Sequence, residues 1–296
     1  MLSNAKASWM LLKQVSNSWL DDYVPSMGAA LAYYTMFSLA PLLLIVISVA
    51  GLVFGENAAR GEIQAELSAL MGSNSAGAVQ DLLTSVQKPA EGAAAALLGL
   101  VLLLVGATTV FAELQASLDR IWHVPTPAPS GGWLGLVRSR LLSFGMILAI
   151  GFLLMVSLVV SAGLAAMGRW WGPMFAGWYA VAAVTNALGG FFLVAAMFAL
   201  IYKVMPRVHV QWKDVWIGAL FTALLFMVGK LVIGLYIGHS GLVSGFGAAG
   251  SLVVVLVWVY YSAQIFLIGA EFTWVYANAF GSRRELNEKL LATAPG

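Results

Sequence analysis

Two ionisable side chains, Lys230 and Glu271, interrupt long uncharged stretches of this sequence. A charged side chain costs about 2.5–3.5 kcal/mol at the centre of a bilayer, and residues that bear this cost commonly serve function. At about 1.5 Å per residue, Lys230 would lie roughly 22 Å from the inner end of a helix over 215–237. Two interpretations stay open: Lys230 attracts an anion or a lipid phosphate, or its long side chain reaches the outer interface.

Glu271 lies near the inner end of the last apolar stretch, and it also has two interpretations. Its carboxylate either faces a shared polar cavity or pairs with a nearby base such as Arg283 or Arg284. Its depth differs from that of Lys230 by about 20 Å, so we do not expect these two charges to pair. Asn186 reaches nearly the depth of Lys230, and its amide oxygen can accept a hydrogen bond.

Uncharged polar side chains gather at similar depths in three apolar stretches. If those stretches face one another, the side chains would line a cavity that opens toward the cytoplasm. The alternatives are that hydroxyl groups bond to their own helix or to a neighbouring one, and that the proline only kinks its helix. The expected cavity residues are Tyr33, Tyr34, Ser38, Pro41, Thr108, Thr109, Asn186, Lys230, Tyr260, Tyr261, Gln264 and Glu271.

No arrangement of residues indicates an enzyme. His123, His209 and His239 lie far apart without metal-ligand spacing, and the sequence contains no cysteine. No nucleophile stands at a recognisable spacing from a base. The charged loops hold single scattered bases, whereas nucleic-acid binding needs a basic surface. We therefore expect no catalytic residue, no metal, no cofactor and no nucleic-acid partner.

The composition requires a membrane to surround these residues. The chain is 61% hydrophobic and 9% charged, with a mean hydropathy of +0.89, whereas soluble domains carry about 25% charged residues. A membrane-spanning helix needs about 20 mostly apolar residues, and the charged residues divide the chain into six such stretches. The predicted spans are about 25–54, 92–112, 141–167, 177–202, 215–237 and 248–280.

The distribution of lysine and arginine predicts the orientation of these spans. With the N-terminus inside, eleven of the 15 basic residues face the cytoplasm, three face outward, and Lys230 lies within a span. This bias follows the positive-inside rule. We predict an all-α, polytopic membrane protein that forms a single domain over 1–296, with six transmembrane helices and both ends in the cytoplasm.

Residues 56–91 form a polar connection with apolar residues at helical spacing, so we expect a helical hairpin over the outer (periplasmic) face, broken at 72–77. A further apolar stripe after the second span predicts a short helix along the inner interface. The two hairpin stripes are Ile63, Leu67, Leu70 and Met71, then Val79, Leu82, Leu83 and Val86; the inner stripe is Leu114, Leu118, Ile121 and Trp122.

Three segments resemble the BrkB/YihY family of bacterial inner-membrane proteins. They are AALAYYTMFSLAPLL after Asp22, IYKVMPRVHVQWKD before the fifth span, and GAAGSLVVVLVWVYYSAQIFLIGAEFTWVYA at the end. The segments occur in the expected order, and the resemblance covers nearly the whole chain. Phe246 stands where members often carry Tyr, and Asp119 stands where Asn before Ile-Trp is common. The resemblance implies a six-span protein of the bacterial inner (plasma) membrane; some members are linked to serum resistance and virulence, and others to envelope or lipid transport.

The family also carries an older label, ribonuclease BN, which the absence of an acidic metal cluster and of a basic surface argues against. We predict a transporter or exporter of a small anionic or amphipathic compound, with a lipid-related compound as one option. The alternative is a non-transporting structural or adaptor protein of the cell envelope. The expected partners are membrane lipids, the transported compound and, as an open option, further copies of the chain.

Overall fold

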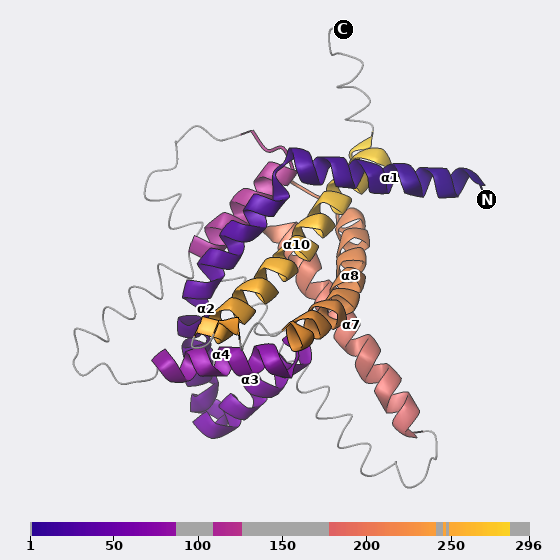
Figure 1. The fold of residues 1–296 in the computed structure, drawn as a ribbon. Coiled ribbons are helices and arrows are strands. Elements are labelled where there is room, and N and C mark those ends of the chain that lie inside the picture. Colours follow the sequence, from indigo (N-terminus) through magenta and orange to yellow (C-terminus); the bar gives the residue numbers. More distant parts are fainter. Residues whose placement is uncertain (1, 87–108, 126–177, 241–244, 247–248, 285–296) are drawn as a thin grey trace. The chain divides into compact units, whose positions relative to one another are not determined.

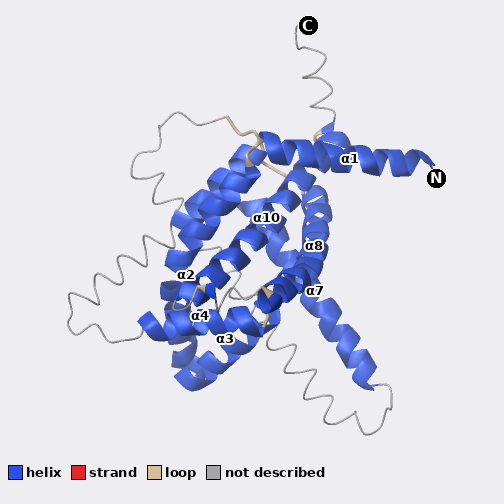
Figure 2. Ribbon diagram, in the orientation of Figure 1, coloured by secondary structure: helices blue, strands red, loops and turns tan. Residues whose placement is uncertain are grey.

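The computed structural model describes residues 2–86, 109–125, 178–240, 245–246 and 249–284, in which every regular element is a helix (Figure 1, Figure 2). The all-α class is therefore confirmed for this part of the chain. Residues 109–121 are also helical. In chain order the named helices are α1 (Leu2–Asp21), α2 (Val24–Phe54), α3 (Glu56–Met71), α4 (Ser73–Val86), α7 (Trp178–Val204), α8 (Trp212–His239) and α10 (Gly250–Ala279).

Four of the predicted spans match observed helices to within about three residues: α2, α7, α8 and α10. Among the described residues, three helical stretches are long and apolar enough to cross a membrane: Ala187–Val204, Trp212–His239 and Gly250–Ala279. The span over 141–167 and most of the span over 92–112 lie outside the described residues. The count of six spans and the orientation therefore stay predictions.

Proline and glycine set the ends of the first long helix. Pro25 lies in the first turn of α2, where its missing N–H group removes no helical hydrogen bond. Gly55, with φ 85°, ends α2, because residues with a side chain rarely adopt positive φ angles. The helix continues without a break through Pro41, and whether this proline kinks the helix stays a prediction.

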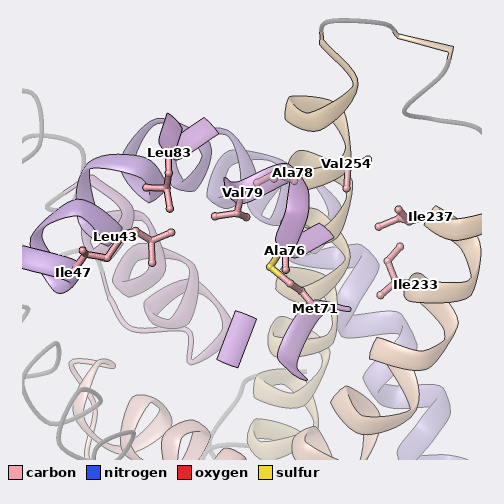
Figure 3. Close-up of a cluster of buried hydrophobic side chains, with 11 residues drawn as sticks. Leu43, Ile47, Met71, Ala76, Ala78, Val79, Leu83, Ile233, Ile237 and Val254 are labelled. Carbon is pink, nitrogen blue, oxygen red and sulfur yellow. The ribbon is translucent and has the colours of Figure 1, made fainter. Parts of the chain in front are cut away.

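The two helices of the predicted hairpin are observed as α3 and α4, but the break between them is narrower than expected, and their place over the outer face stays a prediction. Only Gly72, with φ 82°, separates the two helices, and residues 73–77 belong to α4. The apolar sides of both helices pack onto α2 and onto parts of α8 and α10 (Figure 3). Burying an apolar side chain of this size from water contributes about 1.5–3 kcal/mol. The buried cluster comprises Leu43, Ile47, Met71, Ala76, Ala78, Val79, Leu83, Ile233, Ile237, Val254 and Val255.

The helix α1 was not predicted. Its sequence mixes apolar and polar residues too evenly to resemble a membrane span, yet Leu11, Val15 and Trp19 recur at the four-residue spacing of a helical stripe. The helix ends at Asp21, and Tyr23 adopts the left-handed conformation with φ 56° before α2 begins. The short helix predicted from the inner stripe is confirmed over 109–121, with Leu118, Ile121 and Trp122 buried.

Contacts group the chain into two compact units. Unit 1 draws on Met1–Ser18, Leu118–Leu225 and Gly269–Gly296, and unit 2 on Trp19–Ser117 and Phe226–Ile268. The helices α1, α8 and α10 each contribute residues to both units. All of α7 and the helix ends around Asp214 and Gly281 belong to unit 1, whereas α2, α3 and α4 belong to unit 2.

Candidate functional site

In unit 2, the polar side chain of Gln264 on α10 packs directly against the backbone of α2. A Cβ atom at Gly28 would overlap Gln264 Nε2 and lie 3.1 Å from its Cδ and 3.6 Å from Tyr260 Cε2. An alanine at position 28 would therefore force the flexible end of the Gln264 side chain to move from its place. Both polar atoms of the Gln264 amide are buried, and neither has a hydrogen-bond partner in the described part of the chain. We call Gly28, Tyr260 and Gln264 the amide contact.

The side of α10 that carries Tyr261 and Ile265 packs against α8 in the same unit. A Cβ atom at Gly229 would overlap the end of the Ile265 side chain and lie 3.4 Å from the Tyr261 hydroxyl. Lys230, half-buried, follows Gly229 directly. Three predicted site residues on α10 thus face two different helices, Tyr260 and Gln264 toward α2 and Tyr261 toward α8.

The predicted residues on α2 fall on different sides of that helix. Tyr33 is 55% exposed and makes edge contacts with the rings of Tyr34 and Phe37, at centroid distances of 5.5 and 5.0 Å. Ser38 is buried, and its hydroxyl donates to the Thr35 carbonyl oxygen over 3.2 Å. For Ser38 this bond is the local alternative considered from the sequence. That these residues line one cavity stays a prediction.

Four of the other predicted residues have few described features. Pro41 and Asn186 lie in α2 and α7, and the description there is limited to the backbone. Thr108 lies outside the described residues. Thr109 is half-buried in the helix over 109–121.

Glu271 is completely buried in α10 and belongs to unit 1, so the contacts place it apart from the amide contact. Arg283, one of the bases considered as its partner, lies over the Trp122 ring at 5.2 Å from the centroid, and its pairing with Glu271 stays a prediction. Burial lowers the pKa of Arg283, and the nearby charge of Asp214 opposes that shift.

Sequence reasoning missed a reciprocal contact between α8 and α10 in unit 1. A Cβ atom at Gly218 would overlap Thr273 Oγ1, and one at Gly269 would overlap Thr222 Oγ1. Phe221 and Phe272 stack between these pairs with centroids 4.0 Å apart. Because low residue numbers on one helix meet high numbers on the other, the two helices run antiparallel here. We call Gly218, Thr222, Gly269 and Thr273 the glycine–threonine crossing.

The hydroxyl groups of the glycine–threonine crossing are hydrogen-bonded. Thr222 donates to the Gly218 carbonyl oxygen over 2.7 Å, and Thr273 donates to that of Gly269 over 2.6 Å. Since the Thr222 proton is used in this way, Tyr202 of α7 must donate in its 3.0 Å bond to Thr222 Oγ1. A signal for this contact was present in the sequence, because GALFT (218–222) and GAEFT (269–273) have the same pattern.

Polar contacts also join segments next to the helix ends of unit 1. The buried carboxylate of Asp214 accepts from the Ser282 hydroxyl at 2.6 Å and from its backbone N–H at 3.1 Å. Asp119 accepts from the Arg207 backbone N–H at 2.8 Å and lies 3.5 Å from Arg207 Nε. Burial raises the pKa of Asp119, while the hydrogen bond and the charge of Arg207 oppose the shift.

No three histidine or acidic residues in the described ranges lie close enough together to hold a metal ion. The polar groups described above are therefore amide and hydroxyl groups, one lysine, and carboxylates that do not cluster with histidine or with one another. These groups can bind ligands by hydrogen bonds and charge.

Comparison with known proteins gives one consistent result. The profile of a family described as "Virulence factor BrkB" matches residues 15–291. A UPF0761 membrane protein of Pseudomonas paraeruginosa is 28% identical over 261 residues, which cover 86% of this chain and 60% of that protein. A UPF0761 membrane protein of Tolumonas auensis is 26% identical over 261 residues, which cover 85% of this chain and 80% of that protein.

A third UPF0761 membrane protein, from Pseudoalteromonas translucida, is 27% identical over 267 residues, which cover 90% of this chain and 84% of the relative. The chain thus spans about 60% of the length of the Pseudomonas relatives that it matches. No solved structure matches it. The family match over nearly the whole chain confirms the resemblance, and the chain is a membrane protein that belongs to the BrkB family.

Proposed function

We propose that this protein is a multi-pass transporter or exporter of the bacterial inner membrane that moves a small anionic or amphipathic compound. In this proposal six helices span the bilayer, both chain ends lie in the cytoplasm, and the compound binds beside the amide contact. The observation that carries the proposal is the buried amide of Gln264, which has no hydrogen-bond partner among the described residues.

The energetic cost of burying the Gln264 amide without a partner supports a functional role for it. A buried donor or acceptor without a partner costs about 1–3 kcal/mol. Methionine has nearly the same shape and would avoid that cost at a position enclosed by Gly28 and Tyr260. An amide that lowers stability at a tightly packed position fits a role in another state, in which a bound compound supplies its partners.

Polar and charged groups on α8 and α10 favour an anionic or amphipathic compound. Gln264 Nε2 can donate to a phosphate or carboxylate oxygen, and the tyrosine hydroxyl groups can donate as well. Lys230 brings a positive charge to α8, in which Asp214 is the only acidic residue. The buried side of α2 next to Gly28 is apolar, with Met27 and Leu31, and suits the hydrocarbon part of an amphipathic compound.

The α3–α4 hairpin supports access from the cytoplasmic side. Its apolar cluster packs on residues 43 and 47 of α2 and on residues 254 and 255 of α10. In the proposed orientation these positions lie toward the outer end of each helix, farther out than the amide contact. A hairpin packed there would cover the outer side of the binding region and leave the inner side for entry.

A deletion strain tests the proposal even while the compound itself is unidentified. The strain is complemented with the wild type, Gln264→Met, Gly28→Ala or Gly234→Ala, and extracellular metabolites and envelope lipids are compared by mass spectrometry. Gly234→Ala is the matched control, because a Cβ atom there meets nothing within 4 Å. We expect Gln264→Met and Gly28→Ala to reproduce the deletion profile and Gly234→Ala to restore the wild-type profile.

Two outcomes would count against the proposal. Full complementation by Gln264→Met, at wild-type protein levels, would remove the amide contact as the binding region. A deletion strain with unchanged metabolites and lipids would instead favour the alternative, a structural or adaptor protein of the envelope.

A further inference from the structure

The helix α1 presents three distinct faces, and one of them packs into the protein. Val15 is 6% exposed, and Leu11 and Trp19, one turn before and after it, are half-buried. These residues share one side of the helix, because positions four apart lie nearly above one another. Over residues 9–21, the rest of the circumference of α1 is exposed except at Ser18, which is half-buried.

The open side divides into an apolar stripe and a polar stripe. The apolar stripe contains Trp9, Leu12 and Leu20, which are 71%, 50% and 59% exposed. These positions lie on one side of the helix at 3.6 residues per turn, together with Ser16. The polar stripe lies next to it and contains the exposed residues Lys13, Gln14, Asn17 and Asp21, with one exposed apolar residue, Met10, among them.

The position of α1 in the chain ties this apolar stripe to a membrane surface. Only Asp22 and Tyr23 separate α1 from α2, and short bonds close the junction, with the Tyr23 N–H donating to the Leu20 carbonyl oxygen at 3.1 Å. Residues 24–54 contain no charged side chain and are long enough to cross a bilayer. The end of α1 therefore lies where α2 would enter the bilayer, and Tyr23, with a largely exposed ring, lies at that boundary.

We propose that α1 lies in the membrane surface, with Trp9, Leu12 and Leu20 inserted at the boundary between lipid headgroups and acyl chains. Helices with this division of faces bind membranes in this way, and tryptophan favours that depth. Lys6 and Lys13 add positive charge that suits anionic phospholipids. The inference is independent of what the protein transports, so it can fail while the proposed function holds.

The absence of cysteine from the sequence allows a direct test. Single-cysteine variants of the full chain are spin-labelled and reconstituted in nanodiscs of phosphatidylethanolamine and phosphatidylglycerol. Accessibility to oxygen, which concentrates in lipid, is compared with accessibility to a water-soluble nickel chelate by electron paramagnetic resonance. The variants are Trp9→Cys, Leu12→Cys and Leu20→Cys on the apolar stripe, and Gln14→Cys and Asn17→Cys on the polar stripe.

We expect the ratio of oxygen to nickel accessibility to be several-fold higher on the apolar stripe than on the polar stripe. Equal nickel accessibility on both stripes would overturn the proposal, because the helix would then be in water. Spectral broadening from spin–spin coupling at Leu12→Cys would also overturn it, because a second copy of the chain would then cover this face. If a larger change impairs folding, Ser16→Cys, a nearly isosteric change on the apolar stripe, provides the same accessibility ratio.

Discussion

Two contacts of α10 differ in how their polar groups are satisfied. At the glycine–threonine crossing in unit 1, both threonine hydroxyls donate to carbonyl oxygens and Tyr202 donates to Thr222. At the amide contact in unit 2, a glycine again lets a polar side chain approach a helix backbone, yet Gln264 forms no hydrogen bond within the described residues. A glycine next to a polar side chain thus accompanies a fully hydrogen-bonded contact in one case and a buried amide without a described partner in the other.

The largest expected loss of stability comes from a substitution at the glycine–threonine crossing. Gly269→Ala would force a Cβ atom onto Thr222 Oγ1 and to within 2.6 Å of the Tyr202 hydroxyl position. We expect a loss of about 3 kcal/mol, at the upper end of the cost of overpacking a core. Thermal unfolding in detergent, followed by tryptophan fluorescence, measures the change. Gly190→Ala, at a helical glycine with open space around it, is the control and should not destabilise the protein.

A smaller loss is expected from Thr222→Val, which keeps the shape of the side chain but removes the acceptor for Tyr202. The loss of one buried hydrogen bond costs about 1 kcal/mol in a helical membrane protein. Thr222→Ser, which keeps the hydroxyl, should retain more of the stability than the valine variant when both are unfolded under the same conditions. If valine and serine destabilised equally, the hydrogen bond would have no part in the difference between the two contacts.

The smallest expected change in stability concerns Asp119, a half-buried residue of unit 1. Burial raises the pKa of Asp119 above its ordinary value of 3.8, so the folded protein keeps this proton at pH values where the unfolded chain has lost it. Stability from this group is therefore greatest below about pH 4 and declines as the pH rises through the raised pKa. Asp119→Asn removes that decline and can still accept from the Arg207 N–H group.

At neutral pH we expect Asp119→Asn to raise the free energy of unfolding by about 0.5 kcal/mol, since charge pairs near the surface contribute little. Measuring the free energy of unfolding of both proteins between pH 4 and pH 7 checks how steeply stability declines with pH. If the asparagine variant declined as steeply as the wild type, a group other than Asp119 would cause the decline.

The long helices and the helical hairpin of α3 and α4 could be predicted because uncharged length and apolar spacing are local properties of the sequence. The helix α1 could not, since its apolar stripe is narrow and its overall composition is that of a polar segment. The break of the hairpin was placed too broadly, because Ser73 to Gly77 resemble a loop in composition and yet continue as helix.

The grouping of site residues was less predictable, because depth along a helix does not determine which neighbour a side chain faces. Gln264 and Glu271 are separated by about 10 Å along α10, and they belong to different compact units. Tyr260 and Tyr261 are adjacent in sequence and face different helices. The paired GALFT and GAEFT sequences were a usable signal for one helix contact, whereas no comparable pair marks Gly28 and Gln264.

The most direct test of the difference between the two contacts is the stability of Gln264→Met, measured beside Thr222→Val in the same detergent. We predict that methionine raises the free energy of unfolding by about 1 kcal/mol, because it removes a buried amide that has no partner there. A loss of stability similar to that of Thr222→Val would contradict this prediction, since it would mean that the Gln264 amide is bonded within the folded protein.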